Sequence, residues 1–148
     1  MEWKRKPIKT ILVPLDLSSQ APSVLEEAIH QAKASEAELV LLMVAEDFSD
    51  IGDYAHAAQV QTKLLEETQA KAEDYAQHAK AAGLIPQVEV CQSPSPADAI
   101  LRVAEERQVD FIVMGSRSKR GIDRFVLGSV AGKVVSHAPC SVLVVRNP

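Results

Sequence analysis

The 148-residue sequence has only two cysteines, Cys91 and Cys140, and their separation fits no zinc-binding spacing. Two cysteines are also too few for a disulfide framework, so we expect buried free thiols and a reducing, cytoplasmic compartment. Basic residues do not outnumber acidic ones, and the net charge is −4. An acidic chain gives no global reason to expect nucleic acid or an anionic membrane as a partner.

Long apolar runs are missing as well. The N-terminal segment Met1–Thr10 is basic and is followed by an apolar run too short for a signal-peptide core or a membrane span. The basic residues Lys4–Lys6 are therefore expected to form a solvated tail. The chain length favours a single domain, residues 1–148, with a core of its own.

The standard nucleotide-binding and catalytic motifs do not occur. Gly121 is followed by Ile122 rather than lysine, so no P-loop is present, and no G-x-G-x-x-G follows the first apolar run. P-loop hydrolases and dinucleotide dehydrogenases are therefore disfavoured. No metal site and no catalytic triad is expected, because none of the four histidines has a suitable partner at the required spacing: His30, His56, His78 and His137.

What the sequence does contain is five short apolar runs of strand length. They are Ile11–Leu15, Leu39–Val44, Gln87–Cys91, Phe111–Met114 and Ser141–Val145. Four of the five are continuously apolar, which is typical of parallel strands covered on both faces. The third alternates between polar and apolar residues, which indicates a more exposed strand at the edge of the sheet.

Segments with helical periodicity separate these runs. Their apolar stripes span Val24–Ala32, Leu64–Ala79, Ala97–Ala104 and Val130–Ala138. Ser18 and Ser19 are expected to cap the first helix, and Gly83 to end the second. Ser95, followed by Pro96 and Asp98, predicts a capped start of the third helix. The segment Glu46–Gln61 has no clear period and is expected to be a loop with a short helical piece.

The alternation of strands and helices predicts a parallel sheet with helices on both faces. Ligands of such sheets bind at the carboxyl ends of the strands, where strand order reverses. Asp16 follows the first strand, and the glycine-rich, basic segment Gly115–Ser129 follows the fourth. An acid suits ribose hydroxyls, and free amides at the start of the fourth helix suit phosphates. Alternatively, both glycines are turn residues and Ser129 is a helix cap.

With Asp16 and this segment in place, the chain resembles the universal stress protein family. The resemblance runs from "KTILVPLDLSS" to "HAPCSVLVVR" and is most specific in "DFIVMGSRS…VLGSVAGKVVSHAPCSVLVV". It implies an open, doubly wound five-stranded parallel sheet of order 3-2-1-4-5, as in adenine nucleotide alpha hydrolases. It also implies a homodimer formed by pairing the last strands, here Ser141–Arg146, an edge that would otherwise favour aggregation.

The resemblance further implies an ATP site. Many members of the family bind ATP, with or without Mg²⁺, through the pattern G-x2-G-x9-G-[ST]; here its first glycine is Gly115 and its final pair is Gly128–Ser129. Asp16 would contact the ribose or the adenine end of the nucleotide. Four residues would form the walls around the adenine: Pro14, Leu15, Val44 and Met114. Three would approach the phosphates: Arg117, Ser118 and Val130.

The second glycine of the pattern is replaced by Ser118. If that position needs a positive φ, serine costs roughly 1–2 kcal/mol relative to glycine. Three functions therefore follow. The first is an ATP-binding regulatory protein of the stress response, and the second is a dimeric interaction module that binds no nucleotide. The third is a very slow ATP hydrolase, for which Asp16 is the only candidate acid.

Overall fold

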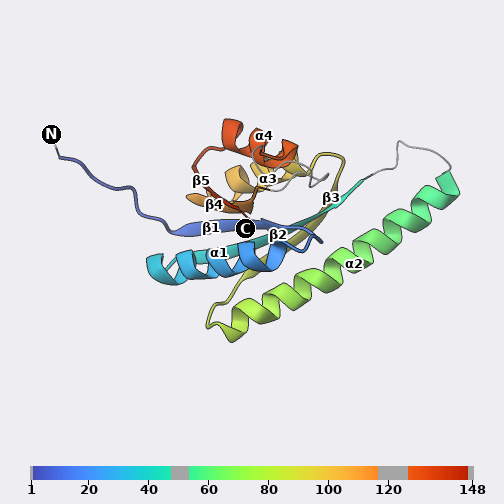
Figure 1. Cartoon of the computed structure of the whole chain (residues 1–148), viewed down its shortest axis with the longest axis horizontal. Coiled ribbons are helices and arrows are strands. Elements are labelled where there is room, and N and C mark those ends of the chain that lie inside the picture. Colours follow the sequence, from blue (N-terminus) through green and yellow to red (C-terminus); the bar gives the residue numbers. More distant parts are fainter. Residues whose placement is uncertain (1, 48–53, 117–126, 147–148) are drawn as a thin grey trace.

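The computed structural model describes residues 2–47, 54–116 and 127–146, and within α2 it describes the side chains from residue 56 on. Strands and helices alternate along the chain (Figure 1). The elements are β1 (Thr10–Leu15), α1 (Ala21–Ser35), β2 (Glu38–Glu46), α2 (Tyr54–Ala81), β3 (Gln87–Ser93), α3 (Pro96–Glu106), β4 (Phe111–Gly115), α4 (Ser129–His137) and β5 (Ser141–Val145).

The five strands form one parallel sheet in the order β3-β2-β1-β4-β5. Helices α1 and α2 cover one face of the sheet, and α3 and α4 cover the other (Figure 1). The predicted fold class, strand order and two-sided helical cover are confirmed. The edge position predicted for the third strand is confirmed as well.

Each central strand supplies apolar side chains to both faces. In β1, Ile11 and Val13 pack against α1, while Leu12 packs against α3 and α4; all three are fully buried. Successive side chains of a strand point to opposite faces, so a strand covered on both sides is apolar at every position. This explains why the sequence shows continuous runs rather than alternation.

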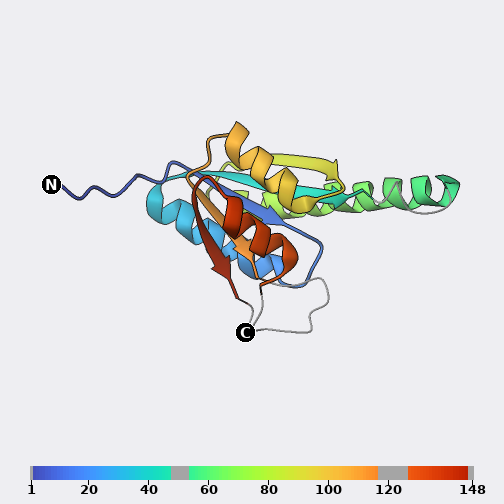
Figure 2. The ribbon, with the colours of Figure 1, turned by 90° about the horizontal axis from the view of Figure 1, so that it is seen from above.

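Helix α2 is longer than the sequence predicts, because it begins at Tyr54 and includes the second half of the segment expected to be a loop with a short helical piece. Its N-terminal part extends past the sheet (Figure 2), and Val60 there is 47% exposed. A helical turn that covers no sheet needs no apolar stripe, so the helical period of the sequence is weak there.

The C-terminal end of α2 is closed by Gly83, which has φ +94°. The Gly83 amide donates to the Lys80 carbonyl, and the Leu84 amide donates to the Ala79 carbonyl. This Schellman motif confirms the predicted stop.

Helix starts follow the sequence in α3 but not elsewhere. The Ser95 hydroxyl accepts a hydrogen bond from the Asp98 amide at 3.3 Å, as predicted. The prediction that Ser18 and Ser19 occupy the cap of α1 was wrong, because the N-cap residue is Gln20, whose side chain makes no capping hydrogen bond. In α4 the N-cap is Gly128, one residue before Ser129. The thiols predicted to be buried, Cys91 and Cys140, are free but half-buried.

Candidate functional site

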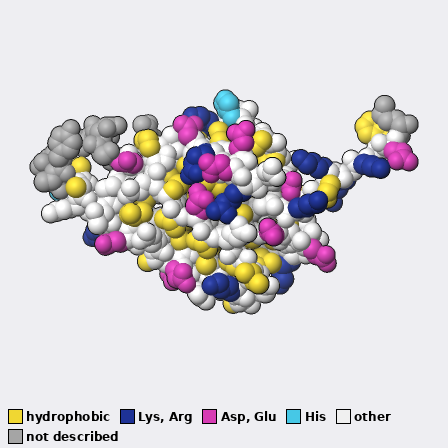
Figure 3. Space-filling model, turned by 180° about the vertical axis from the view of Figure 1, so that it is seen from behind, with side chains coloured by type: hydrophobic (Ala, Val, Ile, Leu, Met, Phe, Trp, Pro, Cys, Tyr) yellow, Lys and Arg dark blue, Asp and Glu magenta, His cyan; other side chains and the backbone are white. Residues whose placement is uncertain are grey.

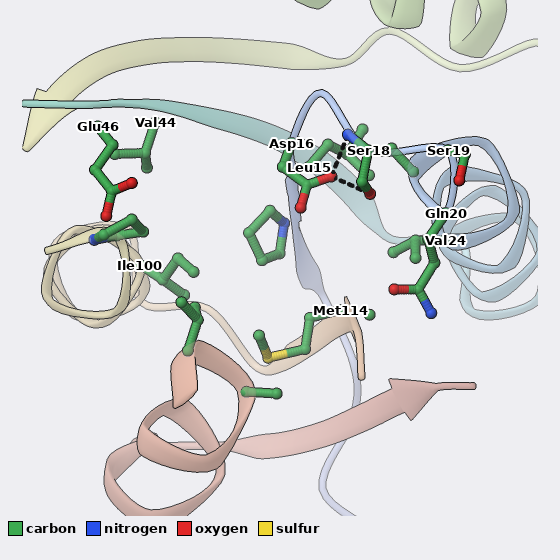
Figure 4. Close-up of a pocket in the computed structure, with 16 residues that line it drawn as sticks. Leu15, Asp16, Ser18, Ser19, Gln20, Val24, Val44, Glu46, Ile100 and Met114 are labelled. Carbon is green, nitrogen blue, oxygen red and sulfur yellow. Dashed lines mark hydrogen bonds between the residues drawn. The ribbon is translucent and has the colours of Figure 1, made fainter. Parts of the chain in front are cut away.

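A cavity of about 630 Å³ lies at the carboxyl ends of the strands, and it is lined by residues of β1 and β4 together with residues from β2, α1, α3 and α4 (Figure 4). Strand order reverses between β1 and β4, because the chain runs outward from β1 to β3 and then returns to β4. The cavity therefore lies at the topological switch point, where open parallel sheets bind ligands. Its volume lies within the range of small-molecule sites.

Pro14 explains why the sheet opens at this point. The pairing of β1 with β2 continues through Leu15, whereas the pairing of β1 with β4 comprises only Ile11 with Phe111 and Leu12 with Ile112. Proline has no amide hydrogen and cannot donate to a neighbouring strand. The ladder between β1 and β4 therefore stops short of Pro14, which lines the cavity instead.

A short turn after β1 holds Asp16 at the cavity. The Ser18 amide and hydroxyl both donate to Asp16 Oδ1, at 2.9 and 2.5 Å (Figure 4). Both bonds use the same carboxylate oxygen, so neither occupies Oδ2. An ionised carboxylate accepts several hydrogen bonds, and Asp16 is exposed. The residue can therefore accept a further hydrogen bond from a ligand hydroxyl or amine.

The remaining walls combine apolar surface with a second acid. Met114 and Ile100 lie on one side of the cavity, and Val44 and Glu46 lie across it from the Ser18–Gln20 segment (Figure 4). The Gln61 side chain donates to the Glu46 carbonyl at 3.0 Å and so fixes the end of β2 to α2. A flat ring in the cavity would therefore have apolar contacts with the walls and polar groups at the rim of the cavity.

The start of α4 lies beside the cavity, which Val130 and Ala131 line. The Gly128 amide donates to the Ser116 carbonyl at 3.0 Å, and the Gly132 amide donates to the Gly128 carbonyl at 2.8 Å. The first amides of a helix have no acceptor within the helix and carry partial positive charge. This end of α4 is therefore suited to an anionic group.

The charge of Asp16 acts beyond the cavity. Burial, with the negative charges of Asp16 and Asp74, raises the pKa of Tyr75 on α2.

A salt bridge joins α3 and α4 on the opposite face of the sheet, where Lys133 of α4 lies 2.6 Å from Asp98 of α3. The hydrogen bonds from Lys133 and Ser95 lower the pKa of Asp98. The salt bridge thus links α3 and α4, two of the helices that carry cavity residues.

The structure brings most of the predicted site residues together. Seven of them line the cavity: Pro14, Leu15, Asp16, Val44, Met114, Gly115 and Val130. Gly128 and Ser129 lie at the start of α4, with Gly128 buried and Ser129 exposed. Arg117 and Ser118 lie outside the described residues, and contact of any of these residues with a nucleotide stays a prediction.

Sequence reasoning missed several residues that line the cavity. They are Ser18, Ser19, Gln20, Ala21, Val24, Glu46, Pro96, Ile100 and Ala131. The carboxyl-end rule could have found Glu46, because it ends β2 in the same way that Asp16 follows β1. No local pattern marks Gln20, whose side chain donates to the carbonyl of Val145, 125 residues away.

Comparison with known proteins identifies the family. The sequence profile described as "Universal stress protein family" matches residues 7–146. The chain belongs to the universal stress protein family. It is 33% identical over 142 residues to universal stress protein MJ0531 of Methanocaldococcus jannaschii, covering 95% of this chain and 83% of that protein. Among solved structures, universal stress protein UspA from Lactobacillus plantarum superposes with a TM-score of 0.80 at 28% identity, covering 96% of this chain and all of that one.

Two more distant universal stress protein structures contain adenine nucleotides. One is a complex with cAMP, with a TM-score of 0.73, 23% identity and coverage of 97% of this chain and 100% of that one. The other, from Archaeoglobus fulgidus, is a complex with dAMP, with a TM-score of 0.66, 21% identity and coverage of 93% and 98%. At these identities the likeness shows the fold alone, and the ligands are properties of those two proteins.

Neither a membrane span nor a metal cluster stands out in residues 2–47, 54–116 and 127–146. None of the helices described there is both long and apolar enough to cross a bilayer. No group of three or more metal-ligating side chains occurs in the same part of the chain. On the face in Figure 3, the coloured basic and acidic side chains are interspersed rather than gathered into a field of one sign.

Proposed function

We propose that this universal stress protein binds an adenine nucleotide, ATP in particular, and acts as a regulatory protein rather than as an enzyme. The observation that carries the proposal is the cavity at the switch point between β1 and β4. It places the Asp16 carboxylate and apolar walls beside the N-terminal end of α4. A nucleoside phosphate has the matching parts: a flat apolar base, ribose hydroxyls and an anionic group.

Each part of the ligand has a counterpart among the described residues. The base would lie among Pro14, Val44 and Met114, and a ribose hydroxyl would donate to Asp16. The phosphates would lie at the amides that begin α4, where Ser129 adds a hydroxyl. The sequence predicts that Arg117 and Ser118 also approach the phosphates. Adenine nucleotides bound to universal stress proteins of the same fold support the choice of base.

Slow hydrolysis of ATP is the second candidate. It would require a positioned base or a metal-held water next to the terminal phosphate. Asp16 and Glu46 are the acids that line the described cavity, and one oxygen of Asp16 already accepts both Ser18 bonds. Sustained phosphate release by the wild type that Asp16→Ala abolishes would favour the enzyme. Release that is absent, or equal in both proteins, would favour the regulatory function.

The binding experiment is thermal unfolding with and without millimolar Mg-ATP, with Mg-GTP as the control for the base. A ligand at about 100 times its dissociation constant adds roughly 2.7 kcal/mol of stability. For a chain of this size that corresponds to a shift of roughly 5–10 °C. Asp16→Asn should reduce the shift, because the amide is a weaker acceptor for a ribose hydroxyl.

The variant Ser118→Gly, which restores the family pattern, decides between nucleotide binding and the interaction module. A shift in the wild type would mean that serine is tolerated and that the protein senses nucleotide. A shift in Ser118→Gly alone would mean that Ser118 has inactivated the site. No shift in either protein would refute the proposal and leave the interaction module.

A homodimer paired through β5 is the second part of the proposal. Strand β5 is an edge of the sheet and carries four half-buried apolar residues after Ser141. Unpaired apolar edges favour pairing with another chain. Sedimentation equilibrium should therefore give twice the chain mass for the wild type. The variant Val144→Arg changes a β5 residue outside both core clusters, so it should give a folded monomer; a dimer that persists would exclude this edge.

A further inference from the structure

We infer that Gln20 is a positioning residue that fixes Ser116 and Gly128 against the last strand, and so sets the affinity for the phosphates of the nucleotide. The inference rests on the proposed function and assigns a role to a residue outside the family's glycine pattern. It is carried by a set of hydrogen bonds that joins α1, β4, β5 and α4.

Gln20 is an unusual polar residue in this structure. It is 3% exposed, and Thr68 is the other buried polar residue in the described part of the chain. The Thr68 hydroxyl bonds within its own helix, to the Leu64 carbonyl. The Gln20 side chain, at the N-cap position of α1, instead donates from Nε2 to the Val145 carbonyl at 3.2 Å, 125 residues away. A buried polar group is costly unless it is hydrogen-bonded, so this contact constrains where both residues can lie.

The Val145 carbonyl is the centre of the network. It accepts a second hydrogen bond from the Ser116 amide at 3.1 Å. The Ser116 carbonyl in turn accepts the Gly128 amide at 3.0 Å, and Gly128 is the N-cap of α4. The two residues that bracket positions 117–127 are therefore bonded directly to each other. The hydrogen bond from Gln20 to the Val145 carbonyl holds Ser116 and Gly128 in place at the end of β5.

Gly115 provides the space for the Gln20 amide. A Cβ atom at position 115 would lie 2.6 Å from Gln20 Oε1 and 3.0 Å from Gln20 Cδ. The φ of Gly115 is not positive, so close approach rather than backbone conformation requires glycine there. The first glycine of the ATP-binding pattern is therefore needed to leave room for the Gln20 side chain. Gln20 itself lines the cavity (Figure 4).

The consequence for binding is selective. Gln20 lies across the cavity from Val44, so the apolar wall at Val44 would contact the base without it (Figure 4). The amides that begin α4 are effective only if they point at the phosphates, since a displaced donor loses most of its interaction. Loss of the hydrogen bond from Gln20 to Val145 should therefore weaken ATP binding more than adenosine binding.

The test compares Gln20→Met with Gln31→Met. Methionine keeps the length of the side chain and removes the donor. Gln31 lies in α1, the helix that follows Gln20, and also donates from Nε2, but to Glu27 within α1, so it is a matched control. The dissociation constants of ATP and adenosine are measured by titration calorimetry. We expect Gln20→Met to weaken ATP about tenfold, which is about 1.4 kcal/mol, and to change adenosine less than twofold; Gln31→Met should change neither.

Amide hydrogen exchange of the free protein provides a second readout. The Gly128 and Ser116 amides should exchange about tenfold faster in Gln20→Met, after correction for any change in global stability. If ATP and adenosine weaken equally, or if exchange at both amides is unchanged, the inference is wrong. If the wild type binds no ATP, the proposed function fails, and the exchange measurement still decides the role of Gln20. If Gln20→Met does not fold, Gln20→Ala also removes the donor and permits the same measurements.

Discussion

The substitution Gly115→Ala tests the packing of Gln20 without touching Gln20 itself. The new Cβ would lie 2.6 Å from Gln20 Oε1 and 3.3 Å from Val24 Cγ2. Contacts under 3.0 Å essentially never occur for real Cβ atoms, so an atom must move. The amide is the end of a flexible side chain and will move first, which breaks its hydrogen bond to the Val145 carbonyl.

The magnitude follows from this displacement. The lost hydrogen bond costs about 1 kcal/mol, and a side chain pushed off its rotamer costs roughly 0.5–1.5 kcal/mol. Alanine reduces the entropy of the unfolded chain relative to glycine and returns about 0.4–1 kcal/mol. The free energy of unfolding should therefore fall by roughly 0.5–2 kcal/mol, with a melting temperature lower by about 1–8 °C.

The assay is urea denaturation of the ligand-free protein, with two comparisons. Gly132→Ala is the control, since a Cβ at this α4 position meets nothing within 4 Å; it should stabilise the protein by roughly 0.5–1 kcal/mol. In a Gln20→Ala background the penalty of Gly115→Ala should vanish. A coupling energy between the two sites below about 0.5 kcal/mol, which is the range for independent sites, would refute the reasoning.

Three further predictions concern the described fold. Ser95→Ala removes the cap of α3 and should cost about 1 kcal/mol in urea denaturation; an unchanged midpoint would mean that the 3.3 Å bond contributes nothing. Because the pKa of Tyr75 is raised in the folded state, the folded protein keeps this proton to higher pH than the unfolded chain does, and stability should fall as pH rises past about 10. Stability curves from pH 9 to 11 should be flatter in Tyr75→Phe. Burial raises the pKa of both thiols, Cys91 and Cys140, so iodoacetamide at about pH 8 should alkylate the native protein more slowly than the urea-unfolded chain; equal rates would contradict this.

The fold could be predicted from the sequence because its signals are local and repeated. Continuous apolar runs separated by helical periods predict parallel strands covered on both faces, as Ile11, Leu12 and Val13 show. The start of α2 could not be predicted in the same way. The N-terminal part of α2 extends past the sheet (Figure 2), and Val60 is exposed, so burial imposed no periodic pattern on the sequence there.

The location of the cavity could also be predicted, but its shape could not. The rule that ligands bind at carboxyl ends points to Asp16 and to the segment after β4. The extent of the opening depends on where the β1–β4 ladder stops, and Pro14 signals this in retrospect. A proline in a central strand argues against regular pairing on both sides, and here it marks the edge of the cavity.

The pair of Gly115 and Gln20 shows why part of a site is invisible to pattern matching. A glycine before a basic segment suggests a flexible turn or a phosphate contact, and both interpretations refer only to neighbouring residues. In the structure the reason for the glycine is the side-chain amide of Gln20, 95 residues earlier in the chain, which also donates to the Val145 carbonyl. Such a requirement exists only once α1, β4 and β5 have assembled. The double-mutant cycle of Gly115→Ala and Gln20→Ala therefore measures a feature of the site that arises from tertiary packing alone.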